Sequence, residues 1–124
     1  MNRLEQVRTD FNNALNRLRE AVETSKTELE IDGAIQRFEF TFELCWKTLK
    51  IFLKDIHGIE CNSPKSCLKK AFELDIINDE KLWLKMVDAR NASVHLYDKK
   101  NSRKIFDAIK NNYLAEFERI IKEI

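Results

Sequence analysis

Apolar residues recur along most of the chain at alternating steps of three and four, which is the spacing of one face of an α-helix. Near the N-terminus this spacing predicts a helix from Leu4 to about Glu23. A longer seam predicts a second helix from about Ile31 to His57, with Gly58 as its stop. The apolar positions of that seam are Ile35, Phe38, Phe42, Cys45, Leu49, Phe52 and Ile56.

The long predicted helix also carries apolar residues off its main seam. They are Phe40, Leu44, Trp46, Ile51 and Leu53. Only a polar strip remains, which contains Gln36, Glu43, Lys47, Lys50 and Lys54. Because one neighbouring helix cannot cover so much apolar surface, we expect this helix to be central in a bundle and also to contribute to a subunit interface.

Three more helices follow. Ser63 and Pro64 suit the start of a short helix that ends near Leu74. Asn78 is expected to cap a fourth helix, and a last helix runs to the C-terminus after a polar break at residues 98–102. Its apolar positions are Phe106, Ile109, Tyr113, Phe117, Ile120 and Ile124. The pattern predicts one all-α domain over residues 1–124, an antiparallel up-and-down bundle of four long helices and one short helix.

Composition supports a helical domain and narrows its function. Only two of the 124 residues are glycine and one is proline. The 22 basic and 21 acidic residues leave a net charge of +1, unlike the strongly basic footprint of a dedicated nucleic-acid binder. No segment resembles a secretory signal or a membrane span of roughly 18 apolar residues. We therefore expect a cytoplasmic protein without membrane contact.

The cysteines suggest neither a disulfide framework nor a metal site. Cys45, Cys61 and Cys67 form no CxxC pair, and their odd number argues against a disulfide framework. With His57, the last two cysteines still do not provide the four closely spaced ligands of structural zinc. We expect no metal and no cofactor.

The segment DARNASVHLYD, residues 88–98, carries the candidate chemistry. On an ideal helix Arg90 lies in the middle of an apolar stripe. That stripe contains Trp83, Met86, Val87, Val94 and Tyr97. A guanidinium stays charged and is costly to bury unpaired, so Arg90 must meet a carboxylate, a partner subunit or an anionic ligand. Asn91 and His95 are neighbours on another face. By spacing alone, an ordinary helix C-terminus explains these residues better than a catalytic site does.

The run Arg90-Asn91-Ala-Ser-Val-His95-Leu-Tyr97 resembles the R-polar-x3-H signature of the HEPN superfamily of small helical domains. It has the RX4HXY form found where a HEPN protein is encoded beside a minimal nucleotidyltransferase. The segments RFEFTFELCWKTLK, SPKSCLKKAFELDII and WLKMVDARNASVHLYD are similar to the nucleotidyltransferase-substrate-binding-protein branch of the superfamily. The resemblance covers about residues 37–97.

The resemblance implies a homodimer with its two motifs close together at the interface. Active members are metal-independent ribonucleases that commonly serve as toxins. On this chain, Arg90 would hold the scissile phosphate, His95 would transfer protons, and Asn91 would orient the histidine or the substrate. Tyr97 would accept an adenylyl group from the nucleotidyltransferase antitoxin, which would block RNA by bulk and charge.

RNA binding would depend on local charge after the motif. The candidate residues are Lys99, Lys100, Arg103 and Lys104. The alternative function is a non-catalytic subunit that binds substrate or nucleotide for a two-component nucleotidyltransferase. The broad apolar surface of the long helix is compatible with that docking role.

Overall fold

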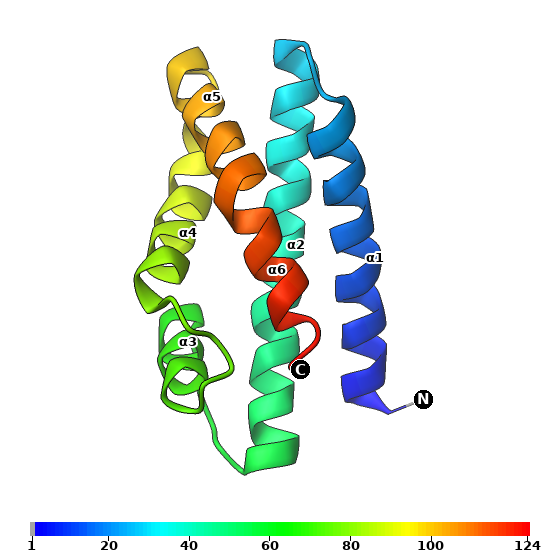
Figure 1. The fold of residues 1–124 in the computed structure, drawn as a ribbon, viewed down its shortest axis with the longest axis vertical. Coiled ribbons are helices and arrows are strands. Elements are labelled where there is room, and N and C mark those ends of the chain that lie inside the picture. Colours follow the sequence, from blue (N-terminus) through cyan, green and yellow to red (C-terminus); the bar gives the residue numbers. More distant parts are fainter. Residues whose placement is uncertain (1) are drawn as a thin grey trace.

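The computed structural model describes residues 2–124 as an antiparallel helical bundle (Figure 1). Its α-helices are α1 (Arg3–Thr24), α2 (Glu28–His57), α3 (Pro64–Glu73), α4 (Glu80–Ala92), α5 (Lys99–Ala108) and α6 (Leu114–Ile120). A π-helical segment, Ile109–Tyr113, joins α5 to α6 without a break, so the two form one rod. Within the described residues there is no strand. The predicted all-α fold, with four long helical rods and the short α3, is confirmed.

The long helix α2 begins three residues earlier than the periodicity predicts. Its first turn is closed by a capping box, in which the Glu30 N–H donates to Thr27 Oγ1 at 3.2 Å and the Thr27 N–H donates to Glu30 Oε1 at 2.9 Å. These bonds satisfy N–H groups that a helix start leaves open. At the other end Gly58 adopts a left-handed conformation with φ 65°, as the sequence predicts.

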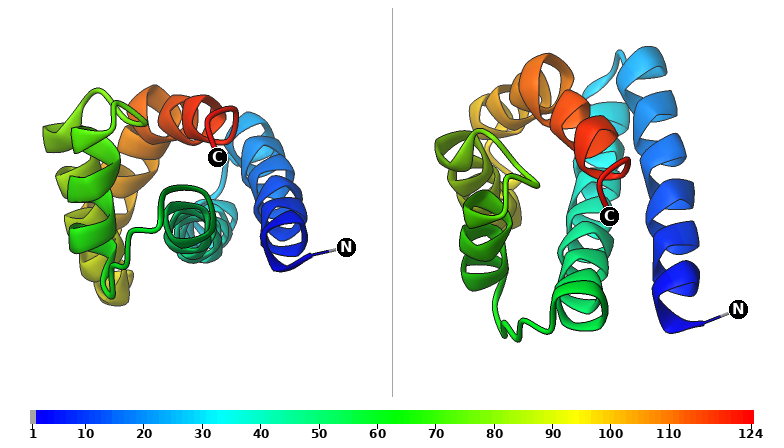
Figure 2. Two further views of the ribbon diagram at one scale, coloured as in Figure 1. Left: turned by 90° about the horizontal axis from the view of Figure 1, so that it is seen from below. Right: turned by 60° about the horizontal axis from the view of Figure 1, so that its bottom comes forward.

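The helix α2 lies at the centre of the bundle. It packs against α1, α3, α4 and α5, and Figure 2 shows the other helices arranged around it. Buried Thr41 and Thr48 each donate a side-chain hydrogen bond at 3.3 Å to a backbone carbonyl of α1. The central position is therefore confirmed. Of the residues off the main seam, Ile51 and Leu53 are buried, while Phe40, Leu44 and Trp46 stay partly exposed.

Aromatic rings from three helices meet in the core. The Phe38 ring lies 5.7 Å from Tyr113 and 6.1 Å from Phe117 between centroids, and Trp83 meets Phe117 edge-on at 5.9 Å. Buried Glu116 accepts a hydrogen bond from Trp83 Nε1 at 3.2 Å, which joins α4 to α6. All six predicted apolar positions of the last helix are buried. The pattern of residues 106–124 therefore predicts its inner face correctly.

Several sequence-based expectations are wrong in detail. Ile56 is 59% exposed because it lies in the last turn of α2, beyond the packed part of the seam. Asp79, and not Asn78, caps α4 by accepting the Leu82 N–H at 3.0 Å. The expected polar break at residues 98–102 is the first turn of α5, because the Asp98 side chain caps that helix.

The cysteine expectation is also wrong. Cys61 and Cys67 form a disulfide that ties the α2–α3 connection to the first turns of α3. An odd number of cysteines does not exclude a disulfide between two cysteines that lie close together in the sequence. Cys45 is the remaining free thiol, and complete burial raises its pKa. It is a core residue, as its place on the α2 seam predicts.

Candidate functional site

Arg90 lies in the last turn of α4, on the side that faces α2. Its Nη2 pairs with Glu43 Oε1 of α2, and about a third of each side chain is exposed. The other Glu43 oxygen accepts a hydrogen bond from Trp46 Nε1 at 3.1 Å. The predicted need for a carboxylate is thereby met within the chain. Glu43 is the member of the predicted polar strip of α2 that meets α4.

The α-helical geometry of α4 ends within the motif. The α-helix stops at Ala92, and Ser93–His95 form a tighter 3₁₀ turn. Ser93 is buried and donates a hydrogen bond to the Arg90 carbonyl at 2.6 Å. Angles from an ideal helix therefore do not apply to the end of the motif. Val94, expected in the apolar stripe, is 73% exposed for this reason.

Side chains in the first turn of α5 bind the backbone at the end of the motif, which we call the motif turn (residues 93–97). Asp98 Oδ1 accepts the N–H groups of Lys100 at 3.0 Å and Asn101 at 3.3 Å. The Asn101 side-chain amide donates to the carbonyls of Ala92 at 3.2 Å and His95 at 3.4 Å. The two bonds of the Asn101 amide tie carbonyls at the end of α4 and in the following turn to α5.

Ser102 also binds the backbone of the motif turn. It is buried, and its hydroxyl donates to the Leu96 carbonyl at 3.0 Å. Asn101 and Ser102 were not among the predicted site residues. The sequence signal that could have located them is Asp98, an N-cap residue type followed by a helix-forming run. The backbone that carries the end of the motif is therefore fixed by residues that follow it.

The two side chains at the end of the motif touch each other. His95 Nδ1 lies 3.2 Å from the Tyr97 hydroxyl oxygen, and the two rings meet edge-on at 89°. Both residues are exposed, and Tyr97 is 86% accessible. The helical projection places Tyr97 on the face of Arg90, but the turn after α4 pairs it with His95. Exposed Asn91 makes no such contact with His95 within the described residues.

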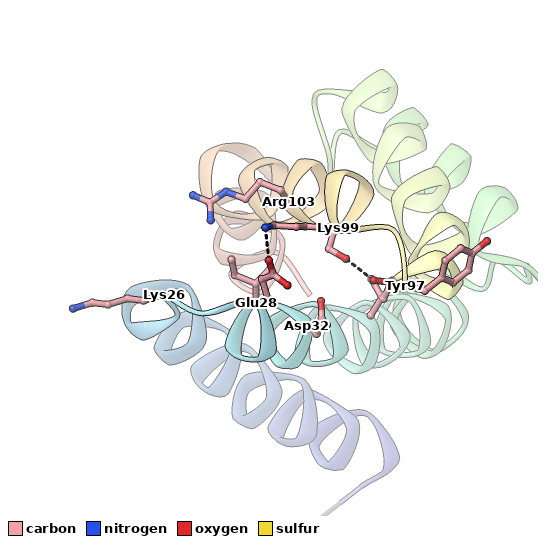
Figure 3. A pocket seen from close by; sticks show the side chains of 9 residues that line it. Lys26, Glu28, Asp32, Tyr97, Lys99 and Arg103 are labelled. Atoms are coloured by element: carbon pink, nitrogen blue, oxygen red, sulfur yellow. Dashed lines mark hydrogen bonds and ion pairs between the residues drawn. The ribbon is translucent and has the colours of Figure 1, made fainter.

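A hollow of about 330 Å³ lies beside the motif turn, between the starts of α2 and α5. Figure 3 shows the Lys99–Glu28 ion pair at its edge and the Tyr97 ring directed away from Lys26 and Arg103. The Glu28 carboxylate accepts a hydrogen bond from Lys99 and raises the pKa of the Lys99 ammonium group. Tyr97 lines the hollow but is 86% exposed, so its hydroxyl is accessible to solvent.

The four predicted RNA-binding residues differ in their surroundings. All four lie on α5 and are exposed. Lys99 pairs with Glu28, and Arg103 Nε lies 3.6 Å from Asp107 Oδ1. No ion pair within residues 2–124 involves Lys100 or Lys104. Acidic neighbours thus neutralise half of the predicted basic set.

Two kinds of feature are absent from residues 2–124. No group of three or more His, Cys, Asp or Glu side chains in this part of the chain could hold a metal ion. Within the same residues, no helix combines the length and the apolar character needed to cross a membrane.

Comparison with known proteins matches the chain to one family. Residues 6–124 match the family described as nucleotidyltransferase substrate binding protein like. The chain is also 30% identical over 98 residues to a Haemophilus influenzae protein named probable ribonuclease HepT. That alignment covers 76% of this chain and 66% of the relative, which is just under two thirds of its length.

Two solved structures have the same fold. A Thermus thermophilus protein is 35% identical with a TM-score of 0.86, over 91% of this chain and 97% of that one. HI0074 from Haemophilus influenzae is 22% identical with a TM-score of 0.70, over 97% of this chain and 95% of that one. HI0074 is described as having the fold of a substrate-binding domain of a nucleotidyltransferase. At this identity, the likeness to HI0074 concerns the fold alone.

Proposed function

The chain belongs to the nucleotidyltransferase substrate-binding-protein family, a HEPN-like branch, and we propose that it is a metal-independent ribonuclease toxin controlled by a minimal nucleotidyltransferase. The observation that carries this proposal is the exposed His95–Tyr97 pair at the end of α4, one turn beyond Arg90. The name of the Haemophilus influenzae relative supports the ribonuclease part. We propose that the protein acts in the cytoplasm, because the proposed substrates, RNA and ATP, are found there.

His95 is the proposed proton-transfer group. An imidazole changes its protonation state near neutral pH, so it can both accept and donate a proton in the reaction. When Nδ1 accepts the Tyr97 hydroxyl hydrogen, the neutral ring carries its proton on Nε2. Once the ring has also gained a proton at Nδ1, the imidazolium can protonate the leaving oxygen of the cleaved RNA strand.

Arg90 is the proposed phosphate-binding group. Its contact with Glu43 uses Nη2, while a guanidinium has five N–H donors in a planar fork. The remaining donors can therefore bind the oxygens of a phosphate and stabilise the charge that develops there. We assign Glu43 to holding the guanidinium in place and Asn91 to orienting the substrate.

Tyr97 is the proposed control point. Its ring is accessible to a partner enzyme and touches His95. An adenylyl group on the phenol oxygen would add a negative phosphodiester and a nucleoside beside the histidine. An RNA phosphate would then meet both a steric block and repulsion.

RNA contact would use local charge and a second subunit. Lys100 and Lys104 are the stronger candidates, because Lys99 and Arg103 each have an acidic partner. A homodimer would double any basic surface beside the motif. We propose that the two motifs face each other across the twofold axis, so that both copies of Arg90 and His95 act on one RNA.

Expression without the partner tests the ribonuclease. The wild type should slow growth and fragment cellular RNA, whereas His95→Ala should do neither, because it lacks the proton-transfer group. His57→Ala is the matched control, since His57 is the other histidine and packs against Phe52, away from the motif. Equal growth and equally intact RNA for wild type and His95→Ala would refute ribonuclease activity.

The second candidate is a non-catalytic subunit that binds substrate or nucleotide for a two-component nucleotidyltransferase. The family description favours it, as do the partly exposed Phe40, Leu44 and Trp46 of α2 as a docking face. Under this alternative, the purified protein binds a small nucleotidyltransferase and raises its activity but leaves RNA intact. RNA cleavage by the free protein that is lost in His95→Ala would exclude the alternative.

A further inference from the structure

The contact between His95 and Tyr97 has a consequence for the modification reaction itself. A phenol is a weak nucleophile while it keeps its proton, and a neighbouring base activates it. The proposed acceptor oxygen of Tyr97 lies 3.2 Å from His95 Nδ1, within the reach of a general base. Because the phenol is 86% exposed, an incoming triphosphate can approach it without displacing the histidine.

Two carboxylates near this tyrosine, Asp98 and Glu28, already have other partners. Asp32 lines the same hollow as Tyr97 but makes no hydrogen bond to its hydroxyl. Asp98 Oδ1 accepts two backbone N–H groups as the cap of α5. Glu28 pairs with Lys99 at the edge of the hollow beside Tyr97. Within residues 2–124, the hydrogen-bond partner of the Tyr97 hydroxyl is the His95 ring nitrogen. The histidine is therefore the base that this chain places at the phenol.

We propose that His95 is a catalytic residue for the adenylylation of its own neighbour, Tyr97. His95 Nδ1 takes the phenol proton while the phenol oxygen forms a bond to the α-phosphorus of ATP. The bond between that phosphorus and the bridging oxygen to the β-phosphate breaks, and pyrophosphate leaves. The products are tyrosine-O-AMP, pyrophosphate and one proton, which passes from the imidazolium to solvent.

This inference rests on the proposed function, because it needs Tyr97 to be the adenylyl acceptor. It gives one histidine two roles. The residue that makes the free protein a ribonuclease also prepares the tyrosine whose modification stops it. Loss of His95 should then remove the activity and slow the modification together.

The test measures adenylyl transfer in the complex of the full chain with a minimal nucleotidyltransferase and magnesium ATP. Initial rates come from intact mass at saturating partner, so weaker docking does not limit them. The variants are His95→Ala, His95→Gln, Tyr97→Phe and the control His57→Ala. Glutamine offers an amide oxygen to the phenol but cannot take its proton. Circular dichroism shows whether each variant is folded.

We expect His57→Ala to match the wild type and Tyr97→Phe to stay unmodified. Both His95 variants should react about 100-fold more slowly, the lower end of the range for a lost general base. Added imidazole should restore part of the rate of His95→Ala, because it replaces the missing base.

Three outcomes would overturn the inference while Tyr97 remains the acceptor. They are wild-type rates in both His95 variants, a wild-type rate in His95→Gln alone, and slow transfer in His95→Ala that imidazole does not restore. A different outcome separates the proposed function from this inference. If the wild type gains no adenylyl group on Tyr97, the proposed control by modification fails, whatever the His95 variants do.

Discussion

Arg90 shows how a single residue can conflict with the pattern around it. Its place in the apolar stripe of α4 predicts burial, whereas its charge demands a partner. The ion pair with Glu43 resolves this conflict and leaves part of the guanidinium in contact with solvent. A surface ion pair adds little stability by itself. Its more important effect is to hold a phosphate-binding fork one turn before His95.

Tyr97→Phe keeps the aromatic ring and removes the hydroxyl, so it should distinguish the roles of the two. We expect no mass increase of one adenylyl group when the partner and ATP are present, because the acceptor oxygen is gone. Growth inhibition should also persist in cells that express the partner. Tyr113→Phe is the matched control, since Tyr113 is the other tyrosine and is 5% exposed. An adenylylated Tyr97→Phe protein would contradict the assignment.

At the scale of elements, the motif depends on two helix ends that meet. The end of α4 leaves carbonyl groups open, and the first turn of α5 supplies the side chains that bind them. Asp98 caps α5 directly after Tyr97, so no free linker separates the motif from that helix. The position of His95 and Tyr97 is therefore a property of the α4–α5 junction as a whole.

Asn101→Ala should loosen this junction without unfolding the bundle. Two hydrogen bonds to motif carbonyls are lost, at about 1 kcal/mol each. We expect amide hydrogen exchange over residues 93–98 to become roughly 5- to 30-fold faster, with helix content unchanged by circular dichroism. Asn12→Ala, an exposed change on α1, should leave exchange in that segment as in the wild type. Unchanged exchange in Asn101→Ala would show that its bonds do not hold the turn.

The capping box of α2 predicts a pH dependence. Backbone N–H groups of Thr27 and Lys26 donate to the Glu30 carboxylate and lower its pKa. The folded-state value thus lies below the unfolded value of about 4.3. Ionised Glu30 therefore stabilises the fold above that pH, and this contribution is lost as pH falls through the folded-state pKa.

Glu30→Gln tests this cap. The variant should have a lower free energy of unfolding than the wild type near neutral pH, and the difference should shrink in acid. Urea unfolding across pH 3–7 measures the difference. Glu23→Gln, on the exposed side of α1, serves as the control. A difference that stays constant across this pH range would contradict the role of the charge.

At the scale of the whole molecule, one covalent link closes a short loop. The disulfide joins Cys61 to Cys67, six residues apart, at the far end of the bundle from the motif. Cytoplasmic thiols are usually kept reduced. The proposed function in the cytoplasm therefore requires that the chain also folds with these two cysteines in the dithiol form.

Reduction should weaken the fold without abolishing it. Closing so short a loop contributes about 2 kcal/mol in the chain-entropy model. A reductant should therefore lower the free energy of unfolding of the wild type by about this amount and leave a Cys61→Ser, Cys67→Ser double variant unchanged. Chemical denaturation with and without reductant measures both. A wild type indifferent to reductant would show that the link adds no stability.

The sequence predicts the larger features of the fold well. Periodicity locates the five helical rods, and their inner faces agree with the structure at most positions, because burial of one stripe is what the pattern encodes. The left-handed Gly58 and the Ser63-Pro64 start of α3 were also predictable from local chemistry. Errors concentrate at helix ends: Asp79 caps α4 instead of the expected Asn78, and Asp98 caps α5 within the expected polar break.

By itself, the sequence determined the all-α class, the central place of residues 31–57, and the presence of Arg90, His95 and Tyr97 in one short segment. Only the tertiary structure decided which partner each of these three residues contacts. Glu43 reaches Arg90 because α2 and α4 pack together, although 47 residues separate the two. His95 and Tyr97 touch because α4 gives way to a 3₁₀ turn that α5 then holds. Long-range packing and the exact end of a helix depend on the whole chain, so a local pattern cannot specify them.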